Sequence, residues 1–393
     1  MTEIATLPGI RSIVQELRNR EFPWTGATTY LNNASIGPIP ERTRLALESF
    51  NAKRTAPHLL PDRDLLAELA AAREAAARLI GAAVDEIALT PNTSTGINVA
   101  ARALPLATGE TVLLSDREFP ANVYPWLALK KEGVAVELAP VTAEGWPDEA
   151  RLLERLRDPR VRVLAVSFVQ FANGYRADLA RLSAACRANG TYLVVDGIQG
   201  LGNSPLDVHA LHVDVLATGG QKWLLSPWGS GFVYVRRDLI ARMEPKAVGW
   251  MAYEGTDDHA NLVRYGDTLR ADARRFEVGT IPFQDVLGMT TSLGLLRELT
   301  VEAIGTYVRA LAEPLLAWAE SRGVRIVSPL DEKHRSAIVC IAPDNAREAH
   351  RQLKAAGVVC AFREGAIRLS PHCYNTIDEM EKVIEVLEDA ISR

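Results

Sequence analysis

The sequence is poor in cysteine and contains no long apolar run, and each shortage removes a class of protein. Four cysteines in 393 residues are too few and too scattered for a disulfide framework. Neither they nor the seven histidines show the paired spacing of metal ligands, so we expect reduced thiols and no bound metal. No stretch approaches the roughly 18 consecutive apolar residues of a membrane span.

A strong excess of one charge and a targeting segment are also missing. Acidic residues outnumber basic ones by 49 to 44, and the net charge of -5 gives no sign of a nucleic-acid or membrane partner. Residues 1–9 lack the charged start and apolar core of a secretory leader, so we expect a cytoplasmic protein. Hydrophobic residues at 48% and charged residues at 24% describe a globular chain, which is long enough for two domains.

The sequence does contain a regular alternation of short apolar runs with helical stretches, which is typical of an α/β fold with a mostly parallel sheet covered by helices. The runs lie near residues 86–90, 111–115, 134–138, 162–169, 191–196, 213–217 and 231–235. A helix with Asp62 as a possible cap is expected over 62–80. The residues before it are expected to be irregular, apart from a short strand near Tyr30.

A small α+β portion is expected at the carboxyl end. Helices near 285–300 and 302–322 lead to strands near 324–327, 336–341, 358–362 and 366–370 and to helices near 345–356 and 376–391. We therefore predict a large domain over 31–285 and a small domain over 286–393, on which the segment 1–30 packs.

Lys222 and Asp196 are the most informative residues. Each follows an apolar run that reads as a buried strand, and carboxyl ends of strands in an open α/β sheet share the edge where ligands bind. Alone, either could be a solvated lysine or a turn aspartate. Together they suit pyridoxal 5'-phosphate (PLP), whose aldehyde takes a lysine amine as a Schiff base and whose ring nitrogen needs a carboxylate to stay protonated.

The motifs around this pair resemble the class V aminotransferase family of fold-type I PLP enzymes, which includes cysteine desulfurases, isopenicillin N epimerase-like proteins and C–S lyases. The resemblance runs from about residue 30 to 387, and its motifs are VDGIQG at 195–200, GGQKW at 219–223, RFEVGT at 275–280 and IRLSPHCYNT at 367–376. It implies that 31–285 is the PLP-binding domain. It also implies a homodimer with shared active sites, in which Thr280 reaches the phosphate of the neighbouring subunit.

The resemblance assigns roles around the cofactor ring. Lys222 resembles the Schiff-base lysine that also shuttles the proton, Asp196 the partner of the ring nitrogen, and Gln199 the side chain that faces the phenolic oxygen. Phe119 holds the place of the stacking aromatic residue, which is a histidine in cysteine desulfurases, although it could instead belong to the core. A phenyl ring cannot relay protons as an imidazole can. Gln170 is a weaker candidate for the cofactor oxygen.

The phosphate is expected at a helix amino terminus. Residues 89–98 read as a strand that passes into a helix rich in hydroxyl groups, where free N–H groups and the helix dipole favour an anion. Ser94 is the main candidate, with Thr93 and Thr95, although the same residues could form a plain cap. Thr218 and Gln221, beside the lysine, are further candidates.

The substrate contacts also follow from the resemblance. Arg368 resembles the arginine that grips the α-carboxylate, since a planar guanidinium binds a carboxylate through two parallel hydrogen bonds. Asn32 and Asn33 lie in the family's substrate loop, and Asn173 is a weak candidate for a cofactor contact.

The chain departs from desulfurases in one place. They carry a mobile loop with a nucleophilic cysteine before the arginine strand, whereas here only residues 363–367 separate the strand at 358–362 from Arg368. Cys360 is expected inside that strand, buried and inert. This argues against a persulfide-forming desulfurase.

The favoured function is a PLP-dependent β-elimination or Cβ–S lyase reaction on an α-amino acid, in which Lys222 removes the Cα proton. An aminotransferase is the second alternative and an epimerase the third, because both share the early steps. A noncatalytic binding protein on the same fold is a remote fourth, since it would not need Lys222, Asp196 and Arg368 together.

Overall fold

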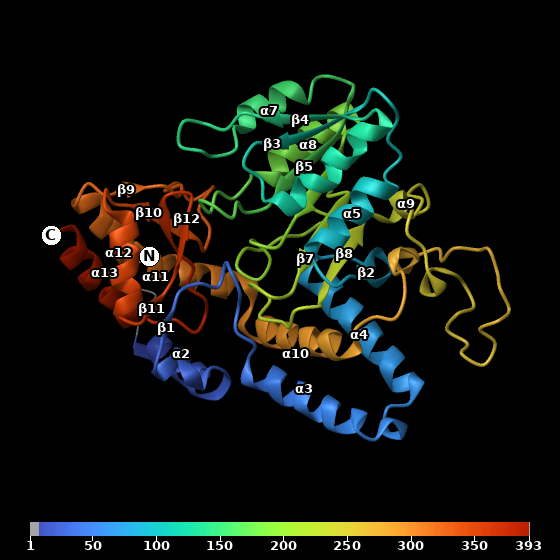
Figure 1. Cartoon of the computed structure of the whole chain (residues 1–393), viewed down its shortest axis with the longest axis horizontal. Coiled ribbons are helices and arrows are strands. Elements are labelled where there is room, and N and C mark those ends of the chain that lie inside the picture. Colours follow the sequence, from blue (N-terminus) through green and yellow to red (C-terminus); the bar gives the residue numbers. More distant parts are fainter. Residues whose placement is uncertain (1–7, 393) are drawn as a thin grey trace.

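The computed structural model describes residues 8–392, and its main feature is a seven-stranded sheet in the order β2-β8-β7-β6-β5-β3-β4. All neighbouring strands are parallel except that β8 runs antiparallel to β2 and β7. The expected mostly parallel sheet is therefore confirmed (Figure 1). The strands are β2 (Ile87–Leu89), β3 (Thr111–Ser115), β4 (Ala135–Ala139), β5 (Val161–Ser167), β6 (Tyr192–Asp196), β7 (Val215–Gly219) and β8 (Gly231–Val235).

Helices cover both faces of this sheet, which explains why its strands read as continuous apolar runs. In β6, Leu193 and Val195 belong to one core cluster, whereas Tyr192 and Val194 belong to a second cluster on the opposite face. The second cluster is closed by α5, and the first by α4, α7, α8 and α10. The helices of this lobe are α4 (Asp62–Ile80), α5 (Thr93–Ala103), α6 (Tyr124–Leu127), α7 (Glu149–Arg155), α8 (Leu179–Asn189), α9 (Arg237–Ile240) and α10 (Phe283–Leu299).

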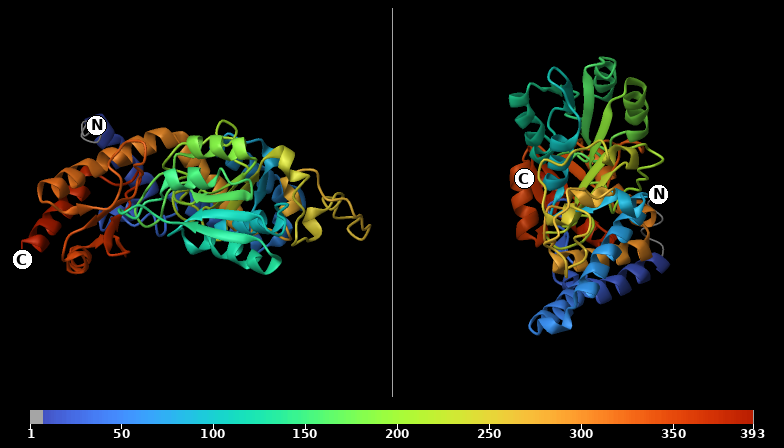
Figure 2. Two further views of the ribbon diagram at one scale, coloured as in Figure 1. Left: turned by 90° about the horizontal axis from the view of Figure 1, so that it is seen from above. Right: turned by 90° about the vertical axis from the view of Figure 1, so that its right-hand side faces the viewer.

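The carboxyl-terminal part forms a smaller lobe at one end of the molecule, drawn in orange and red in Figure 1 and seen from above in Figure 2. An antiparallel sheet in the order β12-β13-β10-β9 packs there with three helices around a third core cluster. Its elements are α11 (Val301–Ser321), β9 (Arg325–Ile326), β10 (Val339–Ala342), α12 (Ala346–Ala355), β12 (Ala361–Arg363), β13 (Ala366–Leu369) and α13 (Ile377–Ile391).

The first sixty residues are more regular than the sequence indicated, and that expectation was wrong. They contain the 14-residue helices α2 (Pro8–Glu21) and α3 (Glu41–Arg54). Only Thr43 and Phe50 are buried in α3, so the apolar stripe that reveals a helix is missing. Its stability comes instead from packing against α10.

The capping of α4 also differs from the expectation. Its N-cap is Pro61, and Asp62 is the first helical residue, where its charge complements the helix dipole. The helix ends at Gly81, which adopts the left-handed conformation that suits glycine.

The amino-terminal segment lies against the small lobe. β1 (Thr29–Tyr30) pairs in parallel with β11 (Val358–Val359). In α2, the buried Arg18 donates to the carbonyl of Tyr374 at 2.7 Å and forms an ion pair with Glu379 at 3.1 Å.

The two lobes meet between α10 and α11. Because α10 packs against α4 and α3, we propose that the large lobe extends to Thr300, beyond the predicted boundary at residue 285. Thr300 has a φ of 60° and caps α11 with its side chain, so the chain changes direction there.

The strand expected over 358–362 is interrupted at Cys360. β11 ends at Val359 and pairs with β1, whereas β12 begins at Ala361 and pairs with β13. Cys360 therefore lies between two strands and is half-buried, a correction to its expected place within one. Cys186, Cys340 and Cys373 are buried and unpaired.

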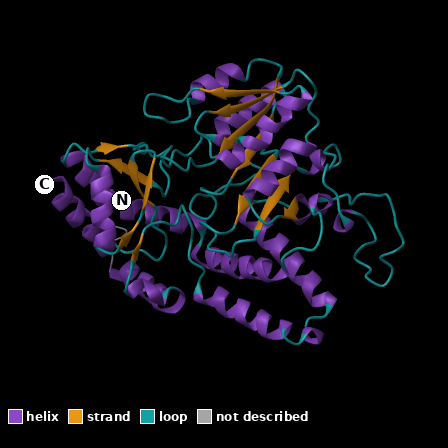
Figure 3. Ribbon diagram, viewed as in Figure 1, coloured by secondary structure: helices purple, strands orange, loops and turns teal. Residues whose placement is uncertain are grey.

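Two further features concern the outside of the molecule. A long loop between Trp250–Ala252 and Ala273–Phe276 projects from the large lobe, away from the small one (Figure 3). Within residues 8–392, no helix is both long and apolar enough to cross a bilayer.

Arg18 generates a stability prediction. Arg18→Ala should lower the free energy of unfolding by about 3 to 5 kcal/mol, because Glu379 would remain buried without its partner. Arg11→Ala is the matched control, since Arg11 joins the same two helices through Asp378 but both side chains are at least half exposed. Urea denaturation measures both. Equal losses for the two variants would contradict the assignment of Arg18 as the docking contact.

Candidate active site

The carboxyl ends of three adjacent strands form the edge that carries the site. Asp196 ends β6, where it pairs in register with Ser167 at the end of β5 and with Ala217 in β7. β7 ends at Gly219, and the following turn carries Lys222. This register places the end of β6, with Asp196, beside the end of β7, after which Lys222 follows. Both residues therefore lie at the same edge of the sheet, as predicted.

The Lys222 turn is held through its backbone by a segment from the amino-terminal part of the chain. The N–H of Gly37 donates to the carbonyl of Gln221 at 2.8 Å, and the amide of Asn33 donates to the carbonyl of Lys222 at 3.3 Å. A Cβ on Gly37 would lie 2.0 Å from the carbonyl oxygen of Lys222, so only glycine permits this approach.

Trp223 fixes the other side of the turn. It is fully buried, and its indole N–H donates to Oε1 of Gln199 at 2.8 Å. Its carbonyl lies 3.2 Å from Nε2 of His372. Burial lowers the pKa of His372 to about 4, so this ring is neutral at pH 7 and donates through Nε2.

Burial shifts the ionisation of both central groups. It raises the pKa of Asp196, which is 2% exposed and accepts from the N–H of Ile198 at 3.0 Å. It lowers the pKa of Lys222, an effect that Asp196 opposes and the charges of Arg368 and Arg363 reinforce. The amine is thus closer to a neutral base than an exposed lysine is.

Phe119 presents an aromatic face beside this amine. Its ring is 40% exposed, lies 5.5 Å from Nζ of Lys222 and packs edge-on against Phe171 at 5.2 Å. An exposed ring at this edge suits a flat heteroaromatic ligand rather than a place in the core.

The predicted phosphate site lies at the amino terminus of α5. Oγ1 of Thr93 is buried without a hydrogen-bond partner in the described residues, and Ser94 is exposed. The hydroxyl of Thr95 is already engaged, because it donates to the cap residue Asn92 at 3.2 Å. Thr93 and Ser94 therefore fit a phosphate better than Thr95 does.

β7 lies directly against this helix. A Cβ on Gly96 would lie 2.6 Å from that of Ala217, so glycine lets α5 approach β7 closely. Thr218, the next residue of β7, is fully buried and donates to the carbonyl of Gly219, while Gln221 is half-buried. Their contact with a phosphate remains a prediction.

Arg368 lies on β13 and faces the same region from the small lobe. It is 2% exposed and donates to the carbonyl of Phe171 and to Oγ of Ser35, each at 2.7 Å. Its Nε has no hydrogen-bond partner, and no carboxylate of residues 8–392 forms an ion pair with it. Burial lowers its pKa to about 10, so it remains cationic at pH 7. A buried cation without a counterion indicates a site for an anionic ligand.

Three sequence candidates have their amides occupied by protein contacts. Asn33 is fully buried between Lys222 and the hydroxyl of Tyr374, so we assign it to positioning the lysine in place of the expected substrate contact. Gln199 bonds both Trp223 and the carbonyl of Ala34. Asn173 donates to the carbonyl of Gly145 and accepts from the N–H of Tyr175. By contrast, Oδ1 of Asn32 is buried without a partner in the described residues.

Gln170 and Thr280 are not joined directly to Lys222. Gln170 is 3% exposed and donates to Glu118 at 2.5 Å. Thr280 is exposed on the segment before α10, and its contact with a neighbouring subunit remains a prediction. Sequence reasoning missed Glu118, although an acidic residue between a buried strand and Phe119 was a usable signal.

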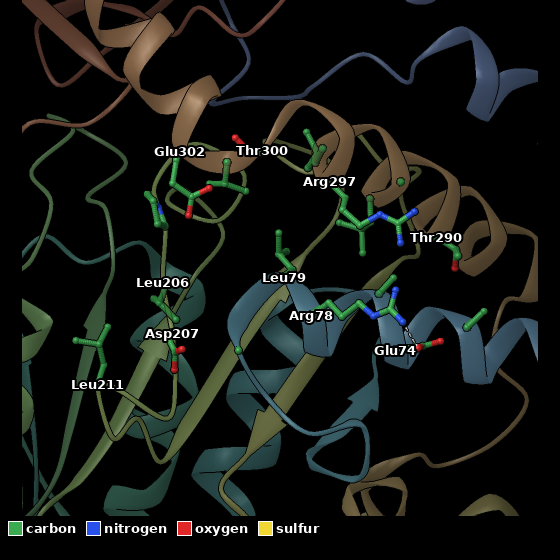
Figure 4. A pocket seen from close by; sticks show the side chains of 18 residues that line it. Glu74, Arg78, Leu79, Leu206, Asp207, Leu211, Thr290, Arg297, Thr300 and Glu302 are labelled. Atoms are coloured by element: carbon green, nitrogen blue, oxygen red, sulfur yellow. Dashed lines mark hydrogen bonds and ion pairs between the residues drawn. The ribbon is translucent and has the colours of Figure 1, made fainter.

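Two cavities lie in different parts of the molecule. One of about 440 Å³ lies where the lobes meet and is lined in part by Glu118, Phe171, Asn173 and Arg363. Another, of about 700 Å³, lies between α4, the end of α10 and the start of α11, with Leu79, Leu206 and Leu211 among its lining residues (Figure 4). None of the predicted site residues lines the larger cavity, so we assign it no part in the chemistry.

The residues at the sheet edge fit PLP. They supply an amine of lowered pKa, a buried carboxylate, an aromatic face and a helix amino terminus with an unsatisfied hydroxyl. No group of three or more histidine, cysteine, aspartate or glutamate side chains in the described part of the chain is arranged to hold a metal.

Comparison with known sequences agrees with this geometry. A family model described as Aminotransferase class-V matches residues 29–383. The uncharacterized aminotransferase YcbU of Bacillus subtilis is 32% identical over 314 residues, which cover 80% of this chain and 81% of that protein. Isopenicillin N epimerase of Amycolatopsis lactamdurans is 30% identical over 389 residues, which cover 92% and 95%.

Two solved structures share the fold. The apo cysteine desulfurase of Thermococcus onnurineus NA1 has a TM-score of 0.86 at 21% identity, over 96% of this chain and 98% of that one. The cystine C-S lyase C-DES, in complex with its product cysteine persulfide, has a TM-score of 0.85 at 23% identity, over 94% and 100%. The expected fold-type I architecture is confirmed. The chain belongs to the class V aminotransferase family and is a PLP-dependent enzyme.

Proposed function

We propose that this enzyme is a Cβ–S lyase that catalyses β-elimination on a sulfur-containing α-amino acid. The observation that carries the proposal is the hairpin between β12 and β13, which is closed by only Glu364 and Gly365. Both have positive φ, 47° and 83°, as a tight two-residue turn requires. This turn leaves no room for a loop that carries a nucleophilic cysteine, so sulfur would leave with the product rather than pass to the protein.

Cys360 does not replace that nucleophile. It lies before β12 rather than in the hairpin, and burial raises the pKa of its thiol to about 12. A thiol in that state is a poor nucleophile at pH 7.

Each of the four main site residues has a separate role in this reaction. Arg368 holds the substrate carboxylate, and Asp196 holds the proton on the ring nitrogen of PLP. When bound, PLP draws electrons from the substrate's Cα bonds. Nζ of Lys222 accepts the Cα proton, and the sulfur on Cβ departs with the bonding electron pair. Phe119 supplies a stacking face but no proton.

We also propose that Ser94, Thr93, Thr218 and Gln221 hold the phosphate and that the enzyme is a cytoplasmic homodimer with shared active sites. Several large apolar side chains are more than two-thirds exposed in the single chain, which supports association with a second copy that would cover some of them. They are Tyr124 at 68%, Trp228 at 69%, Val263 at 77% and Tyr265 at 90%. Thr280 would then reach the partner's phosphate site.

A substrate panel tests the reaction type. Wild-type enzyme with PLP should form pyruvate, ammonia and a sulfur product from cystine or cysteine conjugates, and Lys222→Ala should form none. A keto acid that keeps the substrate's side chain, together with transfer of the amino group to an acceptor, would favour the aminotransferase. A change of configuration at Cα without any other product would favour the epimerase. Alanine with a persulfide on the protein would replace the proposal with a desulfurase.

Lys222 generates a prediction about covalent attachment. Lys222→Ala should abolish the bond to PLP while leaving the thermal midpoint close to that of wild type, because the amine forms no ion pair in the described residues. Mass spectrometry after borohydride reduction measures the adduct. Lys246→Ala, an exposed lysine of the same lobe, is the control and should keep it. An adduct mapped to any other lysine would remove Lys222 from this role.

Arg368 and Cys360 generate opposite expectations. Arg368→Ala should raise KM roughly 30- to 1000-fold, equivalent to about 2 to 4 kcal/mol for a lost charge-assisted contact. Cys360→Ala, on the neighbouring segment, should leave both KM and kcat near the wild-type values. Steady-state kinetics on the substrate found in the panel decides. An inactive Cys360→Ala together with a persulfide trapped on Cys360 would contradict the lyase mechanism.

A further inference from the structure

Glu118 is a buried carboxylate on which four hydrogen-bond donors converge. Its Oε1 accepts from the N–H of Ser167 at 3.0 Å and from the amide of Gln170 at 2.5 Å. Its Oε2 accepts from the hydroxyl of Ser167 and from the amide of Asn122 at 3.1 Å. The residue is 5% exposed and forms no ion pair with any basic group of residues 8–392.

Such an arrangement is costly for a core. A carboxylate without a counterion loses its hydration on burial, and an apolar side chain of similar volume would pack there without that cost. The four donors offset part of it. The residue therefore calls for an explanation other than stability.

The four donors belong to three residues, each in a different part of the candidate site. Ser167 ends β5 and lies in register beside Asp196. Asn122 ends the short helical turn Pro120–Asn122, whose N-cap is Phe119. Glu118 thus holds both ends of the turn that presents the Phe119 ring, because it precedes Phe119 directly and bonds Asn122.

Gln170 extends the same connection to the substrate arginine. The next residue, Phe171, packs its ring against Phe119 and accepts a hydrogen bond from Arg368 through its carbonyl. A single side chain therefore joins the end of β5, the turn of Phe119 and the segment that supports Arg368.

We propose that Glu118 is a positioning residue that fixes the stacking face of Phe119 relative to the guanidinium of Arg368. It acts through its four hydrogen bonds. This inference rests on the proposed placement of PLP against Phe119, but not on which reaction the enzyme catalyses. The expected consequence is that the bound ring keeps one orientation toward the carboxylate site.

Glu118→Ala tests the proposal with readouts that need no substrate. We expect PLP to bind roughly tenfold more weakly by fluorescence titration, because the stacking ring loses its support. We also expect an altered visible circular dichroism of the bound cofactor, which reports how the ring is held. Because neither measurement involves turnover, a failure of the lyase assignment would leave both expectations in place.

Two variants show whether hydrogen-bond geometry is responsible. Glu118→Gln should restore the wild-type dichroism, because Oδ1 of Asn122 is buried without a partner in the described residues and can accept from the new amide once the Asn122 side chain turns. Asp214→Ala is the matched control, since this buried carboxylate bonds Leu193 and Arg236 at the opposite edge of the sheet. It should lower stability but leave PLP affinity and dichroism unchanged.

Several outcomes would contradict the positioning role of Glu118. Wild-type affinity and dichroism in Glu118→Ala would overturn it, as would the same change in Asp214→Ala. A Glu118→Gln variant as impaired as Glu118→Ala would overturn the hydrogen-bond role. If Glu118→Ala does not fold, Asn122→Ala, which removes one of the four donors, should show the same dichroism change in smaller amplitude, and its absence would count against the proposal.

Discussion

The site depends on the approach of residues 33–37 to the Lys222 turn. This short segment binds both lobes at once. Asn33 and Gly37 bond the backbone of the lysine turn, whereas the hydroxyl of Ser35 accepts from Arg368 on β13. The segment itself is anchored on the small lobe, because the N–H of Ala34 donates to the hydroxyl of Ser370. The positions of Lys222 and Arg368 relative to each other are therefore set by a few residues that contact both the lysine turn and β13.

The segment can fulfil this role because its polar atoms are nearly all engaged. The carbonyl of Ala34 accepts from Gln199, and Gln199 accepts in turn from the indole of Trp223. A buried network with satisfied partners resists displacement, because moving one member leaves others unpaired in a low dielectric. Some of the predicted site residues, by contrast, carry buried polar atoms without a partner. Nε of Arg368 and Oγ1 of Thr93 have no partners in the described residues, and both can donate a hydrogen bond to a carboxylate or a phosphate.

The sequence predicted the sheet and the edge at which Asp196 and Lys222 lie, because both follow from local patterns. Each of the strands β3 to β8 is a continuous apolar run that can be recognised within a few residues of sequence. Asp196 and Lys222 come at or just after the ends of two such runs. The support of the site does not follow in this way. The partners of Glu118 come from up to 52 residues away, and Asn33 meets Lys222 across 189 residues. Neither pairing leaves a trace in periodicity or spacing. The break at Cys360 was missed for a related reason, since two short strands that pair with different partners read as one apolar run.

The short hairpin between β12 and β13 bears both on the proposed reaction and on the pKa of Lys222. Besides excluding a nucleophile loop, the turn between β12 and β13 places Arg363 near the lysine. Burial is the main cause of the lowered pKa of Lys222, and the charges of Arg368 and then Arg363 add to it. A longer, mobile loop would carry this second charge away and admit water, and both changes would raise the pKa of the amine again. In the proposed lyase, burial and these two charges favour the neutral form of the Lys222 amine, which is the form that accepts the Cα proton.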